Sequence, residues 1–262
     1  MKSWFFVLLS GLSFGLFMLK RAFEKNVVST SIRLNRYTSS SELSIFFISD
    51  IHRRSISEKW IKKVPPTDIV MIGGDIMEKG VPFSRVEHNI RLLKEVAPVF
   101  FVFGNNDEEV EKDRLESLLL KYEVTILENK AVKWHLEDGQ SIWLAGIGDI
   151  NYQKDDLKRA ISEIDNEDLI VLMSHDPRVI HKLDDQQKTI DFIVSGHTHG
   201  GQIRLFDYSP YDKGGMTTVN SNSIHLISNG FGTTLVPFRL GAKSETHHII
   251  LQNKKSDEST LH

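Results

Sequence analysis

The stretch that decides the fold is Ser195-Gly196-His197-Thr198-His199-Gly200-Gly201-Gln202, which follows an apolar, β-prone run at residues 190–194. Four polar clusters upstream also follow apolar runs of this kind. They are Asp50-Ile51-His52, Gly73-Gly74-Asp75, Gly104-Asn105-Asn106-Asp107 and Ser174-His175-Asp176. A single polar turn after a buried strand is an ordinary way to leave a sheet. Together, however, the five clusters supply enough oxygen and imidazole ligands for two divalent metal ions.

Paired metal ions explain why these residue types occur together. Two ions roughly 3.5–4 Å apart hold a phosphate ester between them and lower the pKa of a bridging water until hydroxide forms near neutral pH. One carboxylate must reach both ions, and we predict Asp75, because its Gly-Gly-Asp turn allows close backbone approach. Residues i and i+2 of an extended strand end point the same way. We therefore expect Asp50 beside His52, and His197 beside His199.

In this order the clusters resemble those of the calcineurin-like metallophosphoesterase superfamily, whose pattern is D-x-H, G-D, G-N-H-D/E, a lone H and G-H-x-H. The longer motif at residues 196–202 is similar to that of a membrane-associated branch of phosphodiesterases and pyrophosphatases that carry GHTHGGQ. The resemblance implies one metal held by Asp50, His52, Asp75 and His199, and another by Asp75, Asn105, His175 and His197. Imidazole and carboxylate ligands without thiolate suit manganese, iron or zinc.

Asn106 departs from the family pattern, which most often has a histidine at this position. The resemblance implies that this histidine assists the leaving group or the transition-state phosphate. An amide cannot deliver a proton near neutral pH. We therefore expect an intact metal core without general-acid help from Asn106, whose amide could instead donate a hydrogen bond to the phosphate.

Composition narrows the class of protein. The 262 residues are 40% hydrophobic, which is ordinary for one large globular domain or two small ones. The formal net charge of −3 and the absence of a basic stripe give no indication of nucleic-acid binding. Because the chain has no cysteine, disulfides and thiolate metal sites are excluded.

The N-terminal residues 4–19 carry no charge and are flanked by Lys2 and by Lys20-Arg21. We predict a single-pass anchor in the cell membrane over residues 1–25, although the run is shorter than the roughly 20 residues that usually span a bilayer. A cleaved signal peptide and a buried or interfacial helix are the alternatives. The basic residues that follow the run favour a cytoplasmic catalytic domain, whereas exported relatives of the branch favour the other side.

After this segment we predict a linker at residues 26–41, a catalytic domain at 42–252 and a polar tail at 253–262. Helices are expected at 56–63 and 84–96, and strands at 45–49, 69–73, 99–103, 142–147, 169–174, 190–195, 202–205, 224–228 and 247–251. This alternation is typical of an α/β fold, and the resemblance implies a four-layer αββα sandwich. Open α/β sheets bind ligands at the C-terminal strand ends, where the clusters lie.

Three further features allow two interpretations each. Arg53-Arg54 either binds a second phosphate or anionic head group or belongs to a solvated loop. The aromatic segment 206–211 forms an apolar wall for a substrate or packs the domain edge, and Arg239 makes a structural ion pair or contacts the substrate.

The predicted function is a dinuclear-metal-dependent phosphoesterase that hydrolyses a phosphodiester or pyrophosphate linkage by attack of metal-bound hydroxide. Its substrate is expected to be a lipid-linked or nucleotide-linked phosphate ester. A phosphomonoesterase or phosphoprotein phosphatase is the main alternative. A non-catalytic metal- or lipid-binding membrane protein is another, but a site without turnover would be free to lose ligands that this chain retains.

Overall fold

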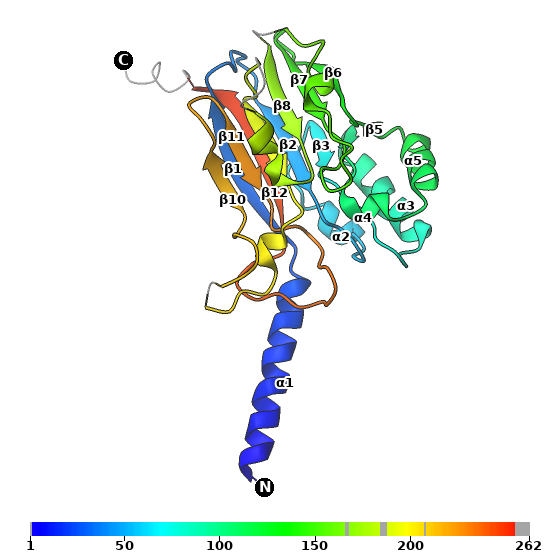
Figure 1. The fold of residues 1–262 in the computed structure, drawn as a ribbon, viewed down its shortest axis with the longest axis vertical. Helices are drawn as coiled ribbons and strands as arrows, with labels where there is room; N and C mark the ends of the chain where they lie inside the picture. The colour runs from blue at the N-terminus through cyan, green and yellow to red at the C-terminus, as the bar shows by residue number, and fades with distance from the viewer. Residues whose placement is uncertain (1, 166–167, 184–187, 207, 255–262) are drawn as a thin grey trace.

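Two mixed β-sheets form the body of the molecule, and the helix α1 (Lys2–Ala22) projects from it (Figure 1). The computed structural model describes residues 2–165, 168–183, 188–206 and 208–254. Within this part of the chain each sheet has six strands. The predicted α/β class is therefore confirmed.

The first sheet has the strand order β1-β12-β2-β3-β4-β5. Its members along the chain are β1 (Asn26–Leu34), β2 (Leu43–Ile48), β3 (Ile69–Ile72), β4 (Val99–Phe101), β5 (Thr125–Ile126) and β12 (Glu245–Asn253). The strands from β2 to β5 are parallel, whereas β12 runs antiparallel to β2 and parallel to β1. Strands such as β3 are apolar throughout because both faces of the sheet are covered.

The second sheet has the order β10-β11-β9-β8-β7-β6. Its members are β6 (Lys130–His135), β7 (Ser141–Gly146), β8 (Leu169–Met173), β9 (Phe192–Ser195), β10 (Gly215–Thr218) and β11 (Ile224–Ile227). The central strands are parallel, and an antiparallel strand closes each edge. Mixed sheets of this kind, with antiparallel edges on a parallel centre, are common in α/β proteins.

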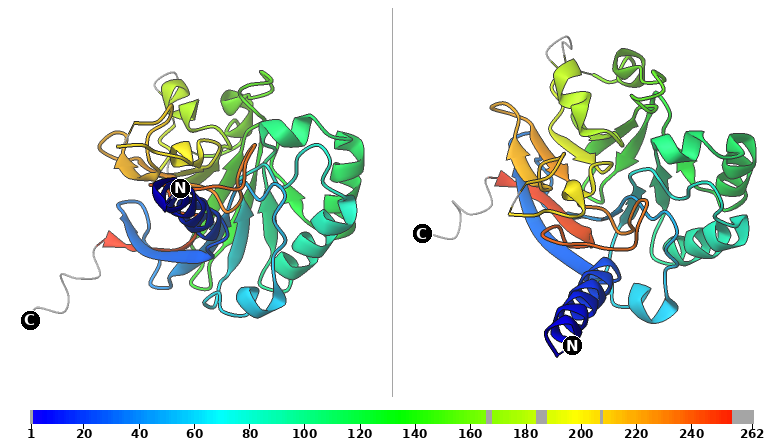
Figure 2. Two further views of the ribbon diagram at one scale, coloured as in Figure 1. Left: turned by 90° about the horizontal axis from the view of Figure 1, so that it is seen from below. Right: turned by 60° about the horizontal axis from the view of Figure 1, so that its bottom comes forward.

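Alternation along β2 shows how the layers pack. Ile45 and Phe47 join a core that also contains Leu144 and Val171 of the second sheet, so the two sheets face each other. Phe46 and the other outward residues of β2 instead pack under α3 (Phe83–Lys94) and α5 (Lys112–Lys121). A third core lies between the second sheet and the short helices α6 (Leu157–Ala160) and η1 (Pro177–Lys182). Helices thus cover the outer face of each sheet (Figure 2).

Three short helical segments complete the list: α2 (Glu58–Ile61), α4 (Asn105–Glu108) and η2 (His199–Gly201). The helices predicted at 56–63 and 84–96 correspond to α2 and α3. The strand predicted at 202–205 is wrong, because Ile203 makes only isolated bridges to Leu240 and Gly241. Of the predicted tail, residues 255–262 lie outside the described residues, and residue 253 still belongs to β12.

The linker predicted at residues 26–41 is also wrong, because β1 occupies most of it. This strand pairs in parallel with β12 from Asn26 opposite Glu245 to Leu34 opposite Asn253. The serine and threonine residues of this segment indicated a linker. The strand with which it pairs, β12, lies at the other end of the chain. Local pattern therefore could not reveal the pairing.

The N-terminal helix is present as predicted, but the membrane-spanning anchor needs a correction. No helix in the described part of the chain is both long and apolar enough to cross a membrane. The uncharged residues 4–19 cover only about 24 Å at 1.5 Å per residue, against a hydrocarbon core of about 30 Å. Serines at positions 10 and 13 and glycines at 11 and 15 further lower the apolar character of the run.

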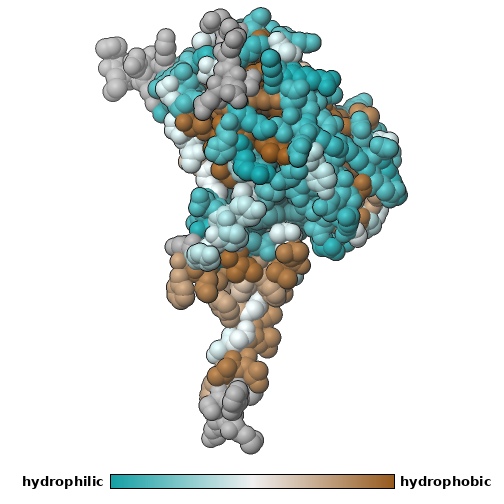
Figure 3. All heavy atoms as spheres, in the orientation of Figure 1, coloured by the Kyte–Doolittle hydropathy of each residue, from teal (hydrophilic) through white to brown (hydrophobic). Residues whose placement is uncertain are grey.

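Arg54 ties the end of α1 to the domain. Its guanidinium donates to the carbonyl oxygens of Ala22 (3.4 Å), Phe23 (3.2 Å) and Glu24 (3.0 Å). It also lies 3.7 Å from the ring centroid of Phe231 and is buried. Neither interpretation of this arginine from the sequence was correct: it stabilises the helix end. Beyond this attachment α1 exposes apolar side chains, visible as a brown projection in Figure 3.

Candidate metal centre

The five polar clusters meet at one edge of the molecule. Asp50 and His52 follow β2. Asp75 follows β3, Asn105 follows β4 and His175 follows β8. His197 and His199 follow β9. Since the C-terminal ends of neighbouring parallel strands lie together, segments far apart in the sequence contribute to one site, as the position of the clusters predicts.

The first subsite consists of Asp50, His52 and His199 with one oxygen of Asp75. The Nε2 atoms of His52 and His199 are 3.0 Å apart, and the two rings stack with centroids 5.0 Å apart. His199 Nε2 lies 3.5 Å from Asp50 Oδ1, and His52 Nε2 lies 3.7 Å from Asp75 Oδ2. Ligand atoms of Asp50, His52 and His199 all lie within 4.8 Å of one another, so a metal ion could reach all three.

The second subsite consists of Asn105, His175 and His197, again with Asp75. His197 Nδ1 lies 2.9 Å from Asn105 Oδ1 and 3.2 Å from His175 Nε2. His175 Nε2 lies 3.4 Å from Asp75 Oδ2. The same oxygen of Asp75 therefore faces an imidazole of each subsite.

This donor set fits divalent metal ions. In each subsite two ring nitrogens face each other across about 3 Å beside a carboxylate oxygen. Neutral imidazole nitrogens and carboxylates are the usual ligands of zinc and of related transition metals. A cation between the facing nitrogens would satisfy their lone pairs together with the carboxylate charge.

Backbone conformation at the site is unusual. Asp50, His52, Asp75, His197 and His199 all have positive φ, between 49° and 71°. Residues with a Cβ seldom adopt this conformation, and strain of this kind concentrates at functional sites. Because strand alternation does not apply in such turns, it is not what orients Asp50 and His52. It also fails for His197 and His199, which point into different subsites.

Two glycines let the turns approach closely. A Cβ on Gly74, whose φ is 85°, would lie 2.6 Å from His175 Nδ1 and 2.8 Å from the Gly104 nitrogen. A Cβ on Gly196 would lie 2.4 Å from Asp50 Oδ2. Any side chain at either position would push a candidate ligand out of place.

In His52, His175 and His197, the ring nitrogen that does not point to the other candidate ligands lies near an acceptor. Glu78 Oε2 lies 3.0 Å from His52 Nδ1, and the Gly73 carbonyl lies 2.8 Å from His175 Nδ1. Asp176 Oδ2 is 3.9 Å from His197 Nε2. A hydrogen bond at this position determines which nitrogen carries the proton and which faces a metal. Of the three contacts, that of His175 is such a hydrogen bond. No motif in the sequence marks Glu78, which pattern reasoning missed.

His199 has a different neighbour, the buried Arg239. Its Nη2 atom lies 3.2 Å from His199 Nδ1 and also donates to the carbonyls of Asn229 (2.6 Å) and Gly232 (2.7 Å). Among the described residues Arg239 has no ion-pair partner, and it does not line the pocket. It fixes the backbone around His199. Burial, together with the charges of His52 and Arg239, lowers the pKa of His199 to about 3. Its imidazole is therefore neutral, as a metal ligand must be.

The carboxylates and His175 are strongly coupled. Burial acts to raise the pKa of Asp75, but His175 and His52 outweigh it and hold that pKa well below its usual range. Burial likewise acts to lower the pKa of His175, but Asp75 and Asp50 hold it well above the ordinary value. The site therefore concentrates negative charge on Asp75 at neutral pH.

Asn106 holds this carboxylate in place. Its backbone nitrogen donates to Asp75 Oδ1 and its side-chain Nδ2 donates to Asp75 Oδ2, both at 2.8 Å. Asp107 supports the same turn, because it accepts from the backbone nitrogens of Asp75 (2.7 Å) and Gly104 (2.9 Å). Burial and the charge of Asp75 raise the pKa of Asp107 to about 8.

The subsites form the floor of a pocket of about 480 Å³. The exposed surface of its wall is largely apolar. The apolar residues of the wall are Ile203, Pro210, Tyr211, Leu235 and Val236, and the wall also contains Thr198, Gly201, Gln202 and Thr234. Of the aromatic segment 206–211, Tyr211 belongs to this wall, with its ring 6.2 Å from that of His197. Phe206 and Tyr208 remain 97% and 84% exposed, so they do not pack the domain edge.

Residues 43–201 match the family model described as calcineurin-like phosphoesterase, and the chain belongs to this family. Family membership supports a hydrolase and, with the clustered ligands, implies divalent metal ions.

Several other proteins are similar to this chain, and two of those named here are called metallophosphoesterases or carry such a domain. YpbG of Bacillus subtilis (strain 168) is 43% identical over 83% of this chain and 84% of its own length. YkoQ, a metallophosphoesterase of the same organism, is 28% identical over 80% of this chain and 84% of its own. A Bos taurus protein named as a transmembrane protein with metallophosphoesterase domain is 26% identical over 90% of this chain but 59% of its own.

Among solved structures, a 5'-nucleotidase precursor from Thermus thermophilus superimposes with a TM-score of 0.51 at 12% identity. The match covers 84% of this chain and 58% of that protein. At this identity the likeness concerns the fold alone.

Proposed function

We propose that the chain is a dinuclear-metal-dependent phosphoesterase that hydrolyses a phosphodiester or pyrophosphate linkage. One metal would be held by Asp50, His52, Asp75 and His199, and the other by Asp75, Asn105, His175 and His197. The observation that carries the proposal is the position of Asp75, whose Oδ2 lies 3.7 Å from His52 Nε2 and 3.4 Å from His175 Nε2. One carboxylate oxygen is thus placed between two sets of imidazoles.

When bound, a metal pair supplies Lewis acidity toward the phosphate oxygens and lowers the pKa of a bound water. The residues of the chain hold and orient this centre. Asn106 keeps both oxygens of Asp75 directed at the subsites, and Glu78 orients His52 through its Nδ1 atom. The amide of Asn106 is engaged with Asp75, which supports a positioning role at this location rather than proton donation.

The apolar wall of the pocket supports a substrate that carries an apolar group next to its phosphate. Ile203, Leu235 and Val236 would pack against this group while the phosphate rests on the floor. The apolar part of the wall is mainly aliphatic and has one aromatic ring, Tyr211, which favours a lipid-linked ester over a nucleotide-linked one. Exposed apolar side chains on α1 support a position at a membrane surface, where such a substrate would be found.

The test is turnover by the full-length chain with added manganese, zinc or ferrous ion on aryl phosphate monoesters, diesters and a pyrophosphate. The proposal expects metal-dependent hydrolysis that is fastest for the diesters or the pyrophosphate and is abolished by Asp75→Asn. Faster hydrolysis of the monoesters would instead favour a phosphomonoesterase. Bound metal without turnover on any ester would identify a non-catalytic metal-binding protein and overturn the proposal.

A further inference from the structure

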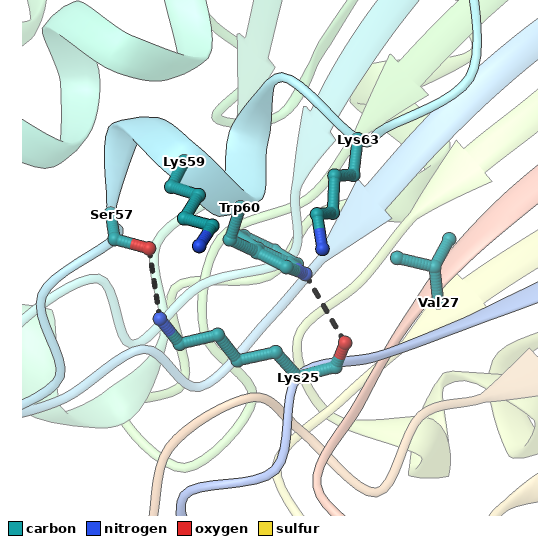
Figure 4. Close-up of a pocket in the computed structure, with 6 residues that line it drawn as sticks. All are labelled: Lys25, Val27, Ser57, Lys59, Trp60 and Lys63. Carbon is teal, nitrogen blue, oxygen red and sulfur yellow. Dashed lines mark hydrogen bonds between the residues drawn. The ribbon is translucent and has the colours of Figure 1, made fainter.

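A second pocket lies near the C-terminal end of α1. It shares no lining residue with the pocket over the candidate metal centre. Its volume is about 470 Å³. It is lined by Lys25, Val27, Ser57, Lys59, Trp60 and Lys63. Figure 4 shows the three lysine side chains gathered around the indole of Trp60. We call this set the lysine pocket.

The floor of the lysine pocket is fixed by hydrogen bonds. Trp60 Nε1 donates to the Lys25 carbonyl (3.1 Å), and the indole stacks on Phe231 with ring centroids 5.0 Å apart. Lys25 Nζ donates to Ser57 Oγ (2.9 Å). Lys59 and Lys63 are four residues apart around the end of α2, a spacing that places side chains on one side of a helix. The amino groups of the three lysines therefore lie around the buried indole of Trp60.

The lysine pocket carries uncompensated positive charge. Within residues 2–165, 168–183, 188–206 and 208–254, no carboxylate forms an ion pair with its three amino groups. The nearby acids are occupied elsewhere, since Glu24 pairs with Arg21 (2.9 Å) and Glu58 with Arg91 (3.7 Å). Desolvation and the charge of Arg54 lower the pKa of Lys25. Like charges gathered at one place repel, and an anion between them would relieve that repulsion.

We propose that the lysine pocket binds a phosphate group. Ammonium groups bind phosphate as compact point charges that donate several hydrogen bonds. The location indicates one source of this group, an anionic phospholipid, because α1 exposes apolar residues such as Phe17, and the exposed Phe23 lies two residues before Lys25 in the chain. The head group would meet the lysines while its chains follow the helix. Free inorganic phosphate has the same chemistry and is the other source.

The experiment titrates the full-length chain, in a nonionic detergent, with dihexanoyl phosphatidylglycerol, dihexanoyl phosphatidylcholine or inorganic phosphate, and measures binding by calorimetry. Lys59→Gln/Lys63→Gln removes two of the three charges without touching the hydrogen bonds of Trp60. The control is Lys62→Gln/Lys130→Gln, which removes the same charge from exposed lysines outside the lysine pocket. Thermal unfolding of all three proteins verifies that the fold is retained.

We expect phosphatidylglycerol to bind more tightly than phosphatidylcholine and to bind at least tenfold more weakly to the Lys59→Gln/Lys63→Gln protein, since each lysine near an anionic surface contributes about 1 kcal/mol. The control variant should stay within about twofold of the unmodified chain. Lysine-dependent binding of phosphatidylglycerol alone would identify a lipid head-group site, and lysine-dependent binding of inorganic phosphate a soluble-phosphate site. Equal affinities of the variant and the unmodified chain for every ligand would overturn the proposal.

Discussion

The two subsites of the candidate centre differ in burial and in the groups that hold their imidazoles. The side chains of Asp50 and His52 in the first are 0% exposed, whereas that of His197 in the second is 18% exposed. Histidines of both subsites line the pocket. In the first subsite the side chains of Glu78 and Arg239 contact the second ring nitrogens of the histidines. In the second subsite the Gly73 carbonyl contacts His175, and the carboxylate of Asp176 lies farther from His197. For the proposed metal pair, this difference predicts that the first subsite retains its ion more tightly than the second.

The largest effect is expected where the two subsites join. Asp75→Ala removes the carboxylate that the proposal assigns to both metals, so metal content should fall at both subsites and turnover of aryl diesters should drop by several orders of magnitude. The measurement combines metal analysis with steady-state kinetics at saturating manganese. Full activity in a metal-replete Asp75→Ala protein would refute the shared-carboxylate arrangement and with it the two-metal proposal.

A matched pair of histidine substitutions separates the subsites. His199→Ala should abolish retention of one ion during gel filtration, because it removes a ligand from the more buried of the two sets. His197→Ala should leave that ion in place, and its lost activity should recover in part as manganese is raised, because the second subsite faces the pocket. Metal stoichiometry after gel filtration is the measurement, and equal loss of metal from both variants would erase the distinction between the subsites.

The carboxylates of Glu78 and Asp176, which lie beside candidate histidine ligands, allow a finer test of the difference between the subsites. Glu78→Gln should weaken metal binding at the first subsite roughly 10–100-fold, the usual effect of losing a carboxylate behind a ligating imidazole. Asp176→Asn should have a smaller effect, confined to the second subsite, because its oxygen lies 3.9 Å from His197 Nε2 compared with 3.0 Å for Glu78 and His52. Competition with a fluorescent chelator measures both affinities. An exposed Arg53→Gln variant, which removes the surface partner of Glu78, serves as control.

The smallest change is expected at Asn106. Asn106→Ala removes the amide that donates to Asp75 but keeps the backbone donor, so turnover should fall roughly tenfold, as for loss of one hydrogen bond to a charged group. If positioning is its whole role, diesters with good and poor leaving groups should slow equally. A loss confined to poor leaving groups would show that this position assists departure after all.

Pattern reasoning succeeded where chemistry is local to a strand end. Runs such as residues 69–72 must be buried strands, and the polar residues after them, including Asp75 and His175, must then gather at one edge of the sheets. It failed for β1 and for Arg54, whose partners lie far away in the sequence. It also missed Glu78, since a loop carboxylate has no periodicity that would distinguish it from a solvated one.

The sequence by itself determined the class of protein, the α/β fold and the residue types of the candidate site, because apolar runs and the ligands that follow them are encoded within a few positions of each other. Only the tertiary structure decided the contacts of Glu78, Arg239 and Asn106 around the candidate ligands, and the lysine pocket beside α1. These depend on left-handed turns and on contacts across long stretches of chain. The physical reason is that such contacts are stabilised by packing of the whole domain, which no short segment specifies.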